Sequence, residues 1–320
     1  MLILHSLPKA ELHLHLEGSI EPETFAELAP GTDPEEARAR YRFCDFAGFI
    51  EAFKWATSYL RSPDDYALIT RRLLESLKRQ NVRYAEITLA AGVVLWRKLD
   101  FAAIYQAVRE SAAESGMTVF WILDAIRHFG AVPAIEVARL AAERVNDGVV
   151  AFGIGGDEAR GPAGWFRDVF AFARSQGLQL TAHAGETCGP ESVWQALEIG
   201  ATRIGHGISS VQDASLLRHL RDHKIPLEIC ISSNVATGAV AALEAHPIRR
   251  IYDAGVPIII NSDDPAVFGT TLTGEYALAR DRFGFTDAEL AQFAENSFRY
   301  AFRYTEELPA CKPNNSATAT

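Results

Sequence analysis

Eight short runs of mostly apolar residues recur along the chain, with longer segments of mixed character between them. The runs are nearly continuous in their apolar residues rather than alternating, which is typical of parallel strands covered on both faces. The sequence therefore predicts eight buried strands, at residues 9–16, 82–90, 117–126, 149–156, 179–183, 203–208, 226–232 and 256–262.

The segments between these runs carry the boundary signals of helices. Ser62 precedes a proline, as an N-cap often does, and Thr286 with Glu289 has the spacing of a capping box. Gly177 and Gly200 fall where a left-handed glycine would end a helix. Strands and helices therefore alternate, which predicts an α/β fold.

The regular alternation, with no Gly-, Ser- or Pro-rich linker between halves, favours a single (β/α)8 TIM barrel formed by residues 1–308. A doubly wound open sheet is the alternative. Residues 21–79 are too many for one crossover, so we expect extra helices there that cap the C-terminal mouth of the barrel. Residues 309–320 are polar and are expected to form a disordered tail.

Composition and charge narrow the choice of partner and compartment. The formal net charge of −10 disfavours nucleic acid and anionic membranes, so a small molecule is the expected partner. There is no apolar run of the roughly 18 residues that a membrane span needs, and the first residues lack the pattern of a secretion signal. We therefore expect a cytoplasmic protein. The four cysteines have no metal-site spacing and are expected to be reduced thiols.

A His-Leu-His sequence at the end of the first predicted strand is the first candidate for chemistry. Because side chains alternate along a strand, His13 and His15 are predicted to lie on one face, with Leu12, Leu14 and Leu16 packed behind it. Two such imidazoles can bind one cation. Histidines that alternate with leucine are often structural, so the interpretation depends on the other strand ends.

Three further predicted strands end in residues that suit a metal. The fifth reaches His183 and Glu186, the sixth contains His206 between two glycines, and the eighth ends at Asp263 and Asp264. In a barrel all these positions lie at the C-terminal mouth, where catalytic residues of such enzymes gather. Taken singly, each has an ordinary structural explanation, as a core histidine, a turn or a cap. Together they predict one zinc ion per subunit, bound by His13, His15, His183 and Asp263.

The remaining histidines fall in a terminus, in loops or on helical segments. We expect them to be solvated or to cap helices rather than to take part in catalysis; they are His5, His128, His219, His223 and His246.

The chain resembles the adenosine deaminase family of zinc-dependent aminohydrolases from residue 7 to about residue 304. The resemblance lies in six motifs in order: LPKAELHLHLEGS at 7–19, GGDE at 155–158, HAGE at 183–186, GHG at 205–207, SSNVATGAV at 232–240 and SDDP at 262–265.

The resemblance implies a role for each polar residue at the mouth. It implies the same four zinc ligands, with Glu186 as the proton donor to purine N1 and His206 beside the water that zinc activates. It also implies that Asp264 hydrogen-bonds N7, that the backbone of Gly156 meets N3, and that His15 and Glu17 lie against the substrate. The expected reaction is the hydrolytic removal of the 6-amino group of an adenosine-type nucleoside, giving the 6-oxo purine and ammonia.

One departure from the family concerns the 5′ end of the substrate. Relatives that act on adenosine often have aspartate near the ribose 5′ oxygen, whereas this chain has Glu17. Residues 44–61 are rich in aromatics and contain Lys54 and Arg61, which could line a pocket for a larger 5′ group. The substrate is therefore expected to be adenosine or a 5′-extended adenosine such as aminodeoxyfutalosine, whose extension ends in a benzoate.

Three other functions remain as alternatives. A two-metal hydrolase usually needs a lysine or carboxylate at the fourth strand end, and here that end is glycine-rich. Deamination of free adenine would use many of the same motifs. A binding protein without activity is disfavoured because Glu186 and the whole ligand set are present. The oligomeric state is not predicted.

Overall fold

The computed structural model describes residues 3–303 and contains a sheet of eight parallel strands in chain order. The strands are β1 (Lys9–His15), β2 (Val82–Leu89), β3 (Thr118–Ile126), β4 (Val149–Gly155), β5 (Gln179–Ala184), β6 (Arg203–His206), β7 (Leu227–Ile229) and β8 (Ile258–Ile260). All eight predicted strands are confirmed. The predicted seventh strand was too long, because helix α11 begins at Ile231; a short apolar run does not distinguish a buried strand from a buried helix.

The barrel closes where β1 meets the residues that follow β8. Leu14 and Asp263 form a parallel bridge, in which the His15 amide donates to the Asp263 carbonyl at 2.9 Å and the Asp263 amide donates to the His13 carbonyl at 3.1 Å. Strand order and closure together confirm a (β/α)8 barrel rather than a doubly wound open sheet. The bridge also places Asp263 beside the strand that carries His13 and His15, so predicted metal ligands from the first and the last strand lie together.

An irregularity in β1 corrects the prediction for Leu12. The pairing of β1 with β2 shifts register between Glu11 and Leu14, and the amides of both Leu12 and His13 donate to the side-chain oxygen of Asn261. Leu12 packs in a small cluster with other strand residues, separate from the main core that contains Leu14. A local bulge of this kind changes the direction of a side chain, which strict alternation does not anticipate.

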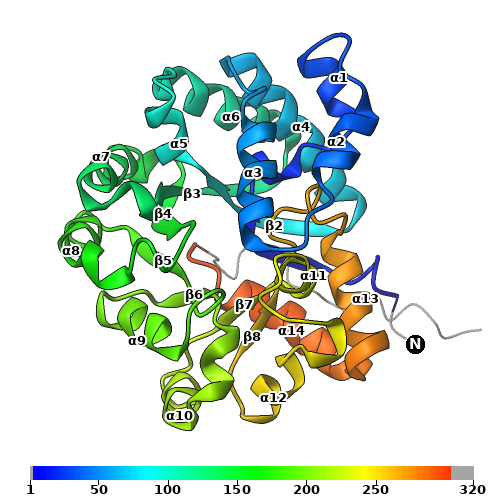
Figure 1. Ribbon diagram of the computed structural model, residues 1–320, viewed down its shortest axis with the longest axis vertical. Helices are drawn as coiled ribbons and strands as arrows, with labels where there is room; N and C mark the ends of the chain where they lie inside the picture. Colours follow the sequence, from blue (N-terminus) through cyan, green and yellow to red (C-terminus); the bar gives the residue numbers. More distant parts are fainter. Residues whose placement is uncertain (1–2, 304–320) are drawn as a thin grey trace, which may run out of the picture.

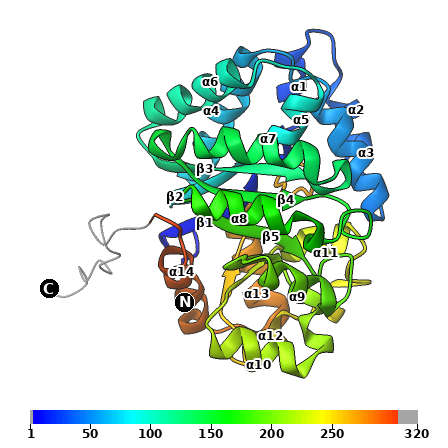
Figure 2. The ribbon, with the colours of Figure 1, turned by 90° about the vertical axis from the view of Figure 1, so that its left-hand side faces the viewer.

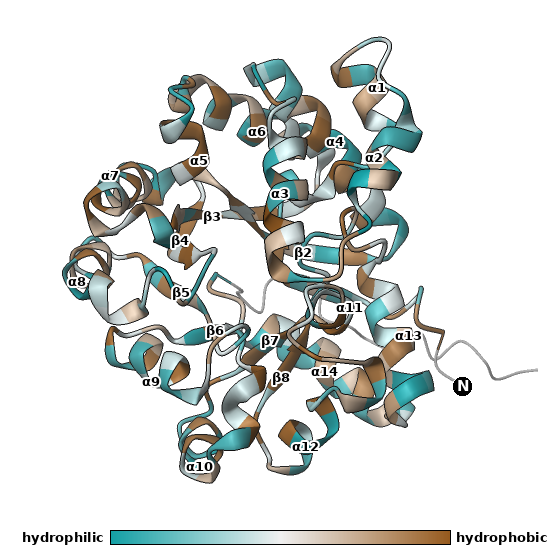
Figure 3. Ribbon diagram, in the orientation of Figure 1, coloured by the Kyte–Doolittle hydropathy of each residue, from teal (hydrophilic) through white to brown (hydrophobic). Residues whose placement is uncertain are grey.

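Fourteen α-helices are described in residues 3–303, and those after β2 alternate with the strands. They are α1 (Thr24–Leu28), α2 (Pro34–Arg40), α3 (Phe46–Thr57), α4 (Pro63–Arg79), α5 (Ala91–Trp96), α6 (Phe101–Ser115), α7 (Ala131–Ala142), α8 (Arg167–Ser175), α9 (Pro190–Glu198), α10 (Ala214–Asp222), α11 (Ile231–Ala236), α12 (Ile248–Asp253), α13 (Leu272–Phe283) and α14 (Asp287–Arg299). Figure 1 shows α7, α8, α9 and α10 as part of the ring around the strands. In Figure 3 hydrophobic and hydrophilic residues alternate along these helices, as expected for helices with one buried face.

The predicted helix boundaries are present. Ser62 and Thr286 are N-caps of α4 and α14, each in a full capping box, the second completed by Glu289. Gly177 and Gly200 follow α8 and α9 with φ of +86° and +98°, the left-handed conformation that glycine adopts without cost.

Four helices, α1 to α4, lie between β1 and β2, as the length of residues 21–79 predicted. Figure 2 shows α3 on the same side of the barrel as α11, with α14 on the opposite side. Because α11 follows the C-terminal end of β7, this is the mouth side, and the expected cap is confirmed.

A buried arginine, Arg203, lies inside the barrel at the end opposite the mouth. Arg203, at the start of β6, forms ion pairs with Glu86 and Glu228, and its guanidinium lies 3.8 Å from the centre of the Phe302 ring. It also donates to the carbonyl of Tyr300. The chain that follows α14 therefore closes the floor of the barrel.

Within residues 3–303 no helix is both long and apolar enough to cross a membrane. The three cysteines in this part of the chain are free thiols. The predicted tail at 309–320, and the last five residues of the predicted barrel domain, lie outside the described residues.

Candidate active site

The four predicted metal ligands converge at the mouth of the barrel. His13 and His15 each place Nε2 3.4 Å from the same Asp263 oxygen, Oδ1, and the Nε2 atoms of His15 and His183 are 3.1 Å apart. All four side chains are at least largely buried. Residues separated by as many as 250 positions in sequence thus present their nitrogen and oxygen atoms to one small volume.

The geometry suits a metal ion. One ligand atom each of His13, His183, His206 and Asp263 lies within 4.8 Å of the other three, and His15, Asp263 and Asp264 form a second group of this kind. His13 Nε2 is buried and has no hydrogen-bond partner among the described residues, so it is free to bind a cation. Imidazoles with one carboxylate are a common donor set for zinc and related metals, so the cluster could hold a metal.

Two of these residues have an uncommon backbone. Asp263 and His206 have φ of +64° and +62°, in the left-handed region that few residues other than glycine adopt. The Asp263 carboxylate is fixed by a 2.6 Å hydrogen bond from the Ser233 hydroxyl. Such backbone conformations gather at functional sites, where the surrounding structure holds them.

In His13 and His183 the second ring nitrogen, Nδ1, lies close to a hydrogen-bond acceptor outside the cluster. His13 Nδ1 lies 2.8 Å from Glu228, the carboxylate that also pairs with Arg203, and His183 Nδ1 lies 3.1 Å from the Ile154 carbonyl. With the Nδ1 proton given to these acceptors, each Nε2 is left with a free lone pair facing the cluster. This is the arrangement that orients histidine ligands in metal sites.

Replacing Glu228 with Gln is therefore expected to weaken metal binding by about 10- to 100-fold, because the buried charge that orients His13 is lost. Competition with a chelator measures the change. Glu86→Gln is the matched control, since Glu86 pairs with the same Arg203 but does not contact His13. Equal losses in both variants would assign the effect to the arginine pair rather than to the histidine.

Glu186 lies beside this cluster as a buried acid. Its carboxyl oxygens are 3.6 Å from His206 Nε2 and 3.4 Å from the Thr237 hydroxyl. Burial raises the pKa of Glu186 well above its usual range, and the negative charges of Asp263 and Glu158 raise it further. The side chain is therefore suited to hold a proton at neutral pH and to donate it.

A hydrogen-bonded chain fixes the orientation of His206. The side-chain amide of Asn234 donates to His206 Nδ1 at 2.9 Å, and its oxygen is 3.2 Å from His246 Nε2. His206 then carries its proton on Nε2, which faces the centre of the site. His246 was expected to be solvated or to cap a helix: it is not solvated, since it is 5% exposed and belongs to this network, but its Nδ1 does accept a hydrogen bond from the Ile248 amide at the start of α12.

Asp264 faces the pocket and has a buried oxygen, Oδ1, without a hydrogen-bond partner among residues 3–303. Burial raises the pKa of Asp264 well above its usual range, and the charge of Asp263 adds to the shift. The backbone passes so close at Gly18 that a β-carbon there would stand 1.8 Å from this oxygen, so glycine is required. A buried polar atom in this state is suited to contact a ligand.

Of the other two predicted substrate contacts, Gly156 lines the pocket and Glu17 does not. Gly156, with φ of +93°, lines the pocket. Glu17 is fully buried behind the pocket wall, where its carboxylate accepts a hydrogen bond of 3.1 Å from the Ala90 amide. Glu17 does not line the pocket itself, whereas Ala90 does.

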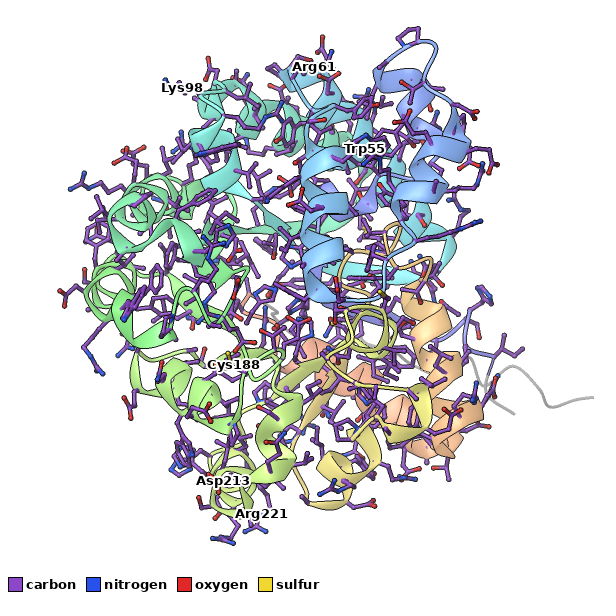
Figure 4. All side chains as sticks on the ribbon, viewed as in Figure 1. Trp55, Arg61, Lys98, Cys188, Asp213 and Arg221 are labelled. Atoms are coloured by element: carbon purple, nitrogen blue, oxygen red, sulfur yellow. The ribbon has the colours of Figure 1, made fainter. Side chains whose placement is uncertain are left out.

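The pocket above the cluster has a volume of about 580 Å³. Its outer wall is built by α3, α5, the last residue of β3 and the residues after it, and it is mainly aromatic and aliphatic. The residues are Phe46, Phe49, Ile50, Phe53, Val93, Trp96, Ile126 and Phe129. Lys54, Arg97 and Arg160 add positive charge. Arg61, which the sequence placed beside Lys54, is not part of the lining, and Figure 4 shows it at the outer edge of the molecule.

Sequence reasoning missed several residues of the site. Asp124 lines the pocket floor, and burial raises its pKa to about 8; a lone carboxylate near the end of an apolar strand was a usable signal. His128, expected to be solvated or capping, also lines the pocket. Asn234 and Glu158 belong to the motifs at 232–240 and 155–158 but were given no role there, because only the tertiary structure reveals their contacts with His206 and with the Glu186 amide.

A closed parallel barrel with a histidine and aspartate cluster at its mouth is the arrangement found in metal-dependent hydrolases with this fold. A family model described as adenosine deaminase matches residues 8–309. The chain therefore belongs to the adenosine deaminase family.

Two groups of relatives are named for different activities. An aminodeoxyfutalosine deaminase of Streptomyces avermitilis is 43% identical over 317 residues, which cover 93% of this chain and 88% of the relative. An adenine deaminase of Rhizobium leguminosarum is 37% identical over 305 residues, covering 92% and 95%. The class of activity is thus deamination.

Solved structures agree with the fold. An adenine deaminase from Arthrobacter aurescens superposes with a TM-score of 0.86 at 29% identity, covering 93% of this chain and 94% of that one. An amidohydrolase from Burkholderia ambifaria with bound zinc has a TM-score of 0.85 at 26% identity, covering 95% and 87%.

Proposed function

We propose that the protein is a zinc-dependent deaminase of a 5′-extended adenosine, with aminodeoxyfutalosine as the substrate. The observation that carries the proposal is a single cavity that joins the histidine and aspartate cluster to an aromatic wall with cations beside it. The similarity to the Streptomyces relative, at 43% identity, supports the same substrate.

The reaction needs an activated water, a proton for the ring and a fixed purine. Zinc held by His13, His15, His183 and Asp263 would supply Lewis-acid activation of the attacking water at neutral pH. The protonated Glu186 carboxyl gives its proton to N1 as water adds to C6. The resulting Glu186 carboxylate takes up the two protons that the added water loses, passing one to the amino group and keeping one, so the tetrahedral centre expels ammonia and leaves the 6-oxo purine.

Three further groups hold the reacting atoms. The Nε2 proton of His206 points to the centre of the site and can stabilise negative charge that develops on the attacking oxygen. A protonated Asp264 can donate to N7, which would satisfy its buried oxygen. The backbone amide of Gly156 is at the pocket surface and is proposed to meet N3.

The aromatic wall supports the extended substrate. Phe49 stacks on Phe268 with 5.1 Å between ring centres and lies 6.0 Å from Phe53, so α3 presents a continuous aromatic surface to the cavity. Trp96 stacks on Phe129 across from it at 5.9 Å. A free purine base would leave this apolar surface in water, whereas an aryl group on the 5′ side would cover it.

The charges of the pocket match the anionic end of such a substrate. The Arg160 side chain makes no hydrogen bond or ion pair with any other described residue, although it lines the cavity. The Arg97 guanidinium, in contrast, donates hydrogen bonds to the carbonyls of Thr57 and Leu60. These bonds connect the end of α3 to the end of α5. Lys54 is paired with Glu51 at 2.7 Å, so Arg160 is the cation of this lining that is available to a benzoate carboxylate.

A comparison of kcat/KM for aminodeoxyfutalosine, adenosine and adenine tests the proposal. The extended nucleoside is expected to be the best substrate, and Phe49→Ala is expected to lower its kcat/KM by about 10-fold while adenosine changes by less than about 3-fold. Trp165→Ala, which removes an exposed aromatic outside the pocket, is the control.

Faster turnover of adenosine would contradict the proposed 5′ extension but not the deaminase class. Adenine is the second candidate, because the Rhizobium relative and the Arthrobacter structure are adenine deaminases by name. A preference for adenine, unaffected by Phe49→Ala, would select it.

A further inference from the structure

Glu158 lies in the segment after β4 and is 2% exposed, outside the lining of the substrate pocket. Its carboxylate accepts hydrogen bonds from the backbone amides of the three residues that directly follow β5. The distances are 2.8 Å to the Gly185 nitrogen, 2.9 Å to the Glu186 nitrogen and 2.9 Å to the Thr187 nitrogen. The Ser192 hydroxyl, at the start of α9, donates to the same carboxylate.

These bonds hold the turn that carries Glu186. The chain leaves β5 at Ala184 and reverses at Gly185, whose φ is +67° and whose carbonyl accepts from the Ser209 amide. A side chain at Gly185 would stand 2.5 Å from Val193 and Ser209, so the turn is tightly enclosed. The direction of the Glu186 side chain therefore depends on the backbone that Glu158 holds.

We propose that Glu158 is a positioning residue, which fixes the turn at residues 185–187 so that Glu186 points its carboxyl group at the reacting ring. This inference rests on the proposed function, in which Glu186 is the proton donor. Glu158 does not line the substrate pocket; it acts on Glu186 through the backbone of the turn, and its negative charge also helps to keep the Glu186 pKa high.

The charge state of Glu158 fits this role. Although burial opposes ionisation, the hydroxyl of Ser192, the amides of the turn and the cation of Arg127 together lower its pKa. An ionised carboxylate has only acceptor atoms, which is what three inward-pointing amides and a hydroxyl require. A glutamine has the same shape but presents an NH₂ donor, so it must leave at least one of these donors without an acceptor.

Glu158→Gln tests the proposal in the metal-loaded, full-length protein. We expect kcat for the best nucleoside substrate to fall by about 100-fold, the loss typical of a catalytic group displaced by about 1 Å. KM is expected to change by less than about 3-fold and the bound metal not at all. In a Glu186→Gln background the same change is expected to have less than about 2-fold effect, because no proton donor remains to be positioned.

Ser192→Ala provides a milder variant that removes one donor to the same carboxylate and keeps the three amides, so a fall in kcat of a few-fold is expected without misfolding. Wild-type kcat in Glu158→Gln would overturn the inference, as would an equal loss in the Glu186→Gln background or a loss of metal. If the wild-type protein deaminates no purine, the proposed function fails instead, so the two failures are distinguishable.

Discussion

Replacing Glu186 with Gln is expected to lower kcat by about 1,000-fold or more, while the bound metal stays at the wild-type level. Proton transfer by a positioned acid contributes about 10²- to 10⁴-fold to a rate. Glutamine has nearly the same volume and keeps the contact with Thr237, but it has no acidic proton to give to N1. Steady-state kinetics and elemental analysis on the same sample measure both quantities.

Glu191→Gln is the matched control for this substitution, because Glu191 is an exposed carboxylate five residues further along the chain, at the start of α9. It should retain full activity. Near-normal turnover in Glu186→Gln would remove this residue from the mechanism, and a parallel loss of metal would make it a structural support of the cluster instead.

Replacing Asp263 with Asn is expected to have the second large effect, a loss of metal affinity greater than about 100-fold with a parallel loss of activity. Asparagine suits the left-handed backbone at this position and preserves the shape, so the change isolates the negative charge that faces His13 and His15. Losing a direct ligand should exceed the roughly 10- to 100-fold cost of losing an outer support.

Asp264→Asn is the control for metal binding. Its side chain adjoins Asp263 and lines the pocket, and one of its oxygens has no hydrogen-bond partner within residues 3–303, so the variant should keep its metal and show a raised KM. Unchanged metal content in Asp263→Asn, measured by elemental analysis after dialysis, would show that Asp263 is not a ligand.

The sequence predicted the barrel and the convergence of the site because both follow from local pattern. Near-continuous apolar runs mark parallel strands, and polar residues directly after them must lie at one end of a closed barrel. His13, His183 and Asp263 come from β1, β5 and the end of β8, and the barrel alone brings them together. Capping residues such as Ser62 are equally local.

The features that were missed depend on contacts between distant segments. The direction of Leu12 is set by Asn261, about 250 positions away, which accepts hydrogen bonds from two successive amides and creates the bulge. His246 is buried and lies within hydrogen-bond distance of Asn234 in α11, and the role proposed for Glu158 depends on amides 27 to 29 positions further along the chain. No periodicity in the sequence encodes such pairings.

The most direct test of the account is to measure ammonia release and loss of the 6-aminopurine absorbance together, with metal-loaded protein and aminodeoxyfutalosine. We predict one ammonia for each 6-oxo product, rapid turnover that disappears in Glu186→Gln, and dependence on the bound metal. No ammonia from aminodeoxyfutalosine, adenosine or adenine, in a sample with a full complement of metal, would contradict the assignment of this site as a purine deaminase.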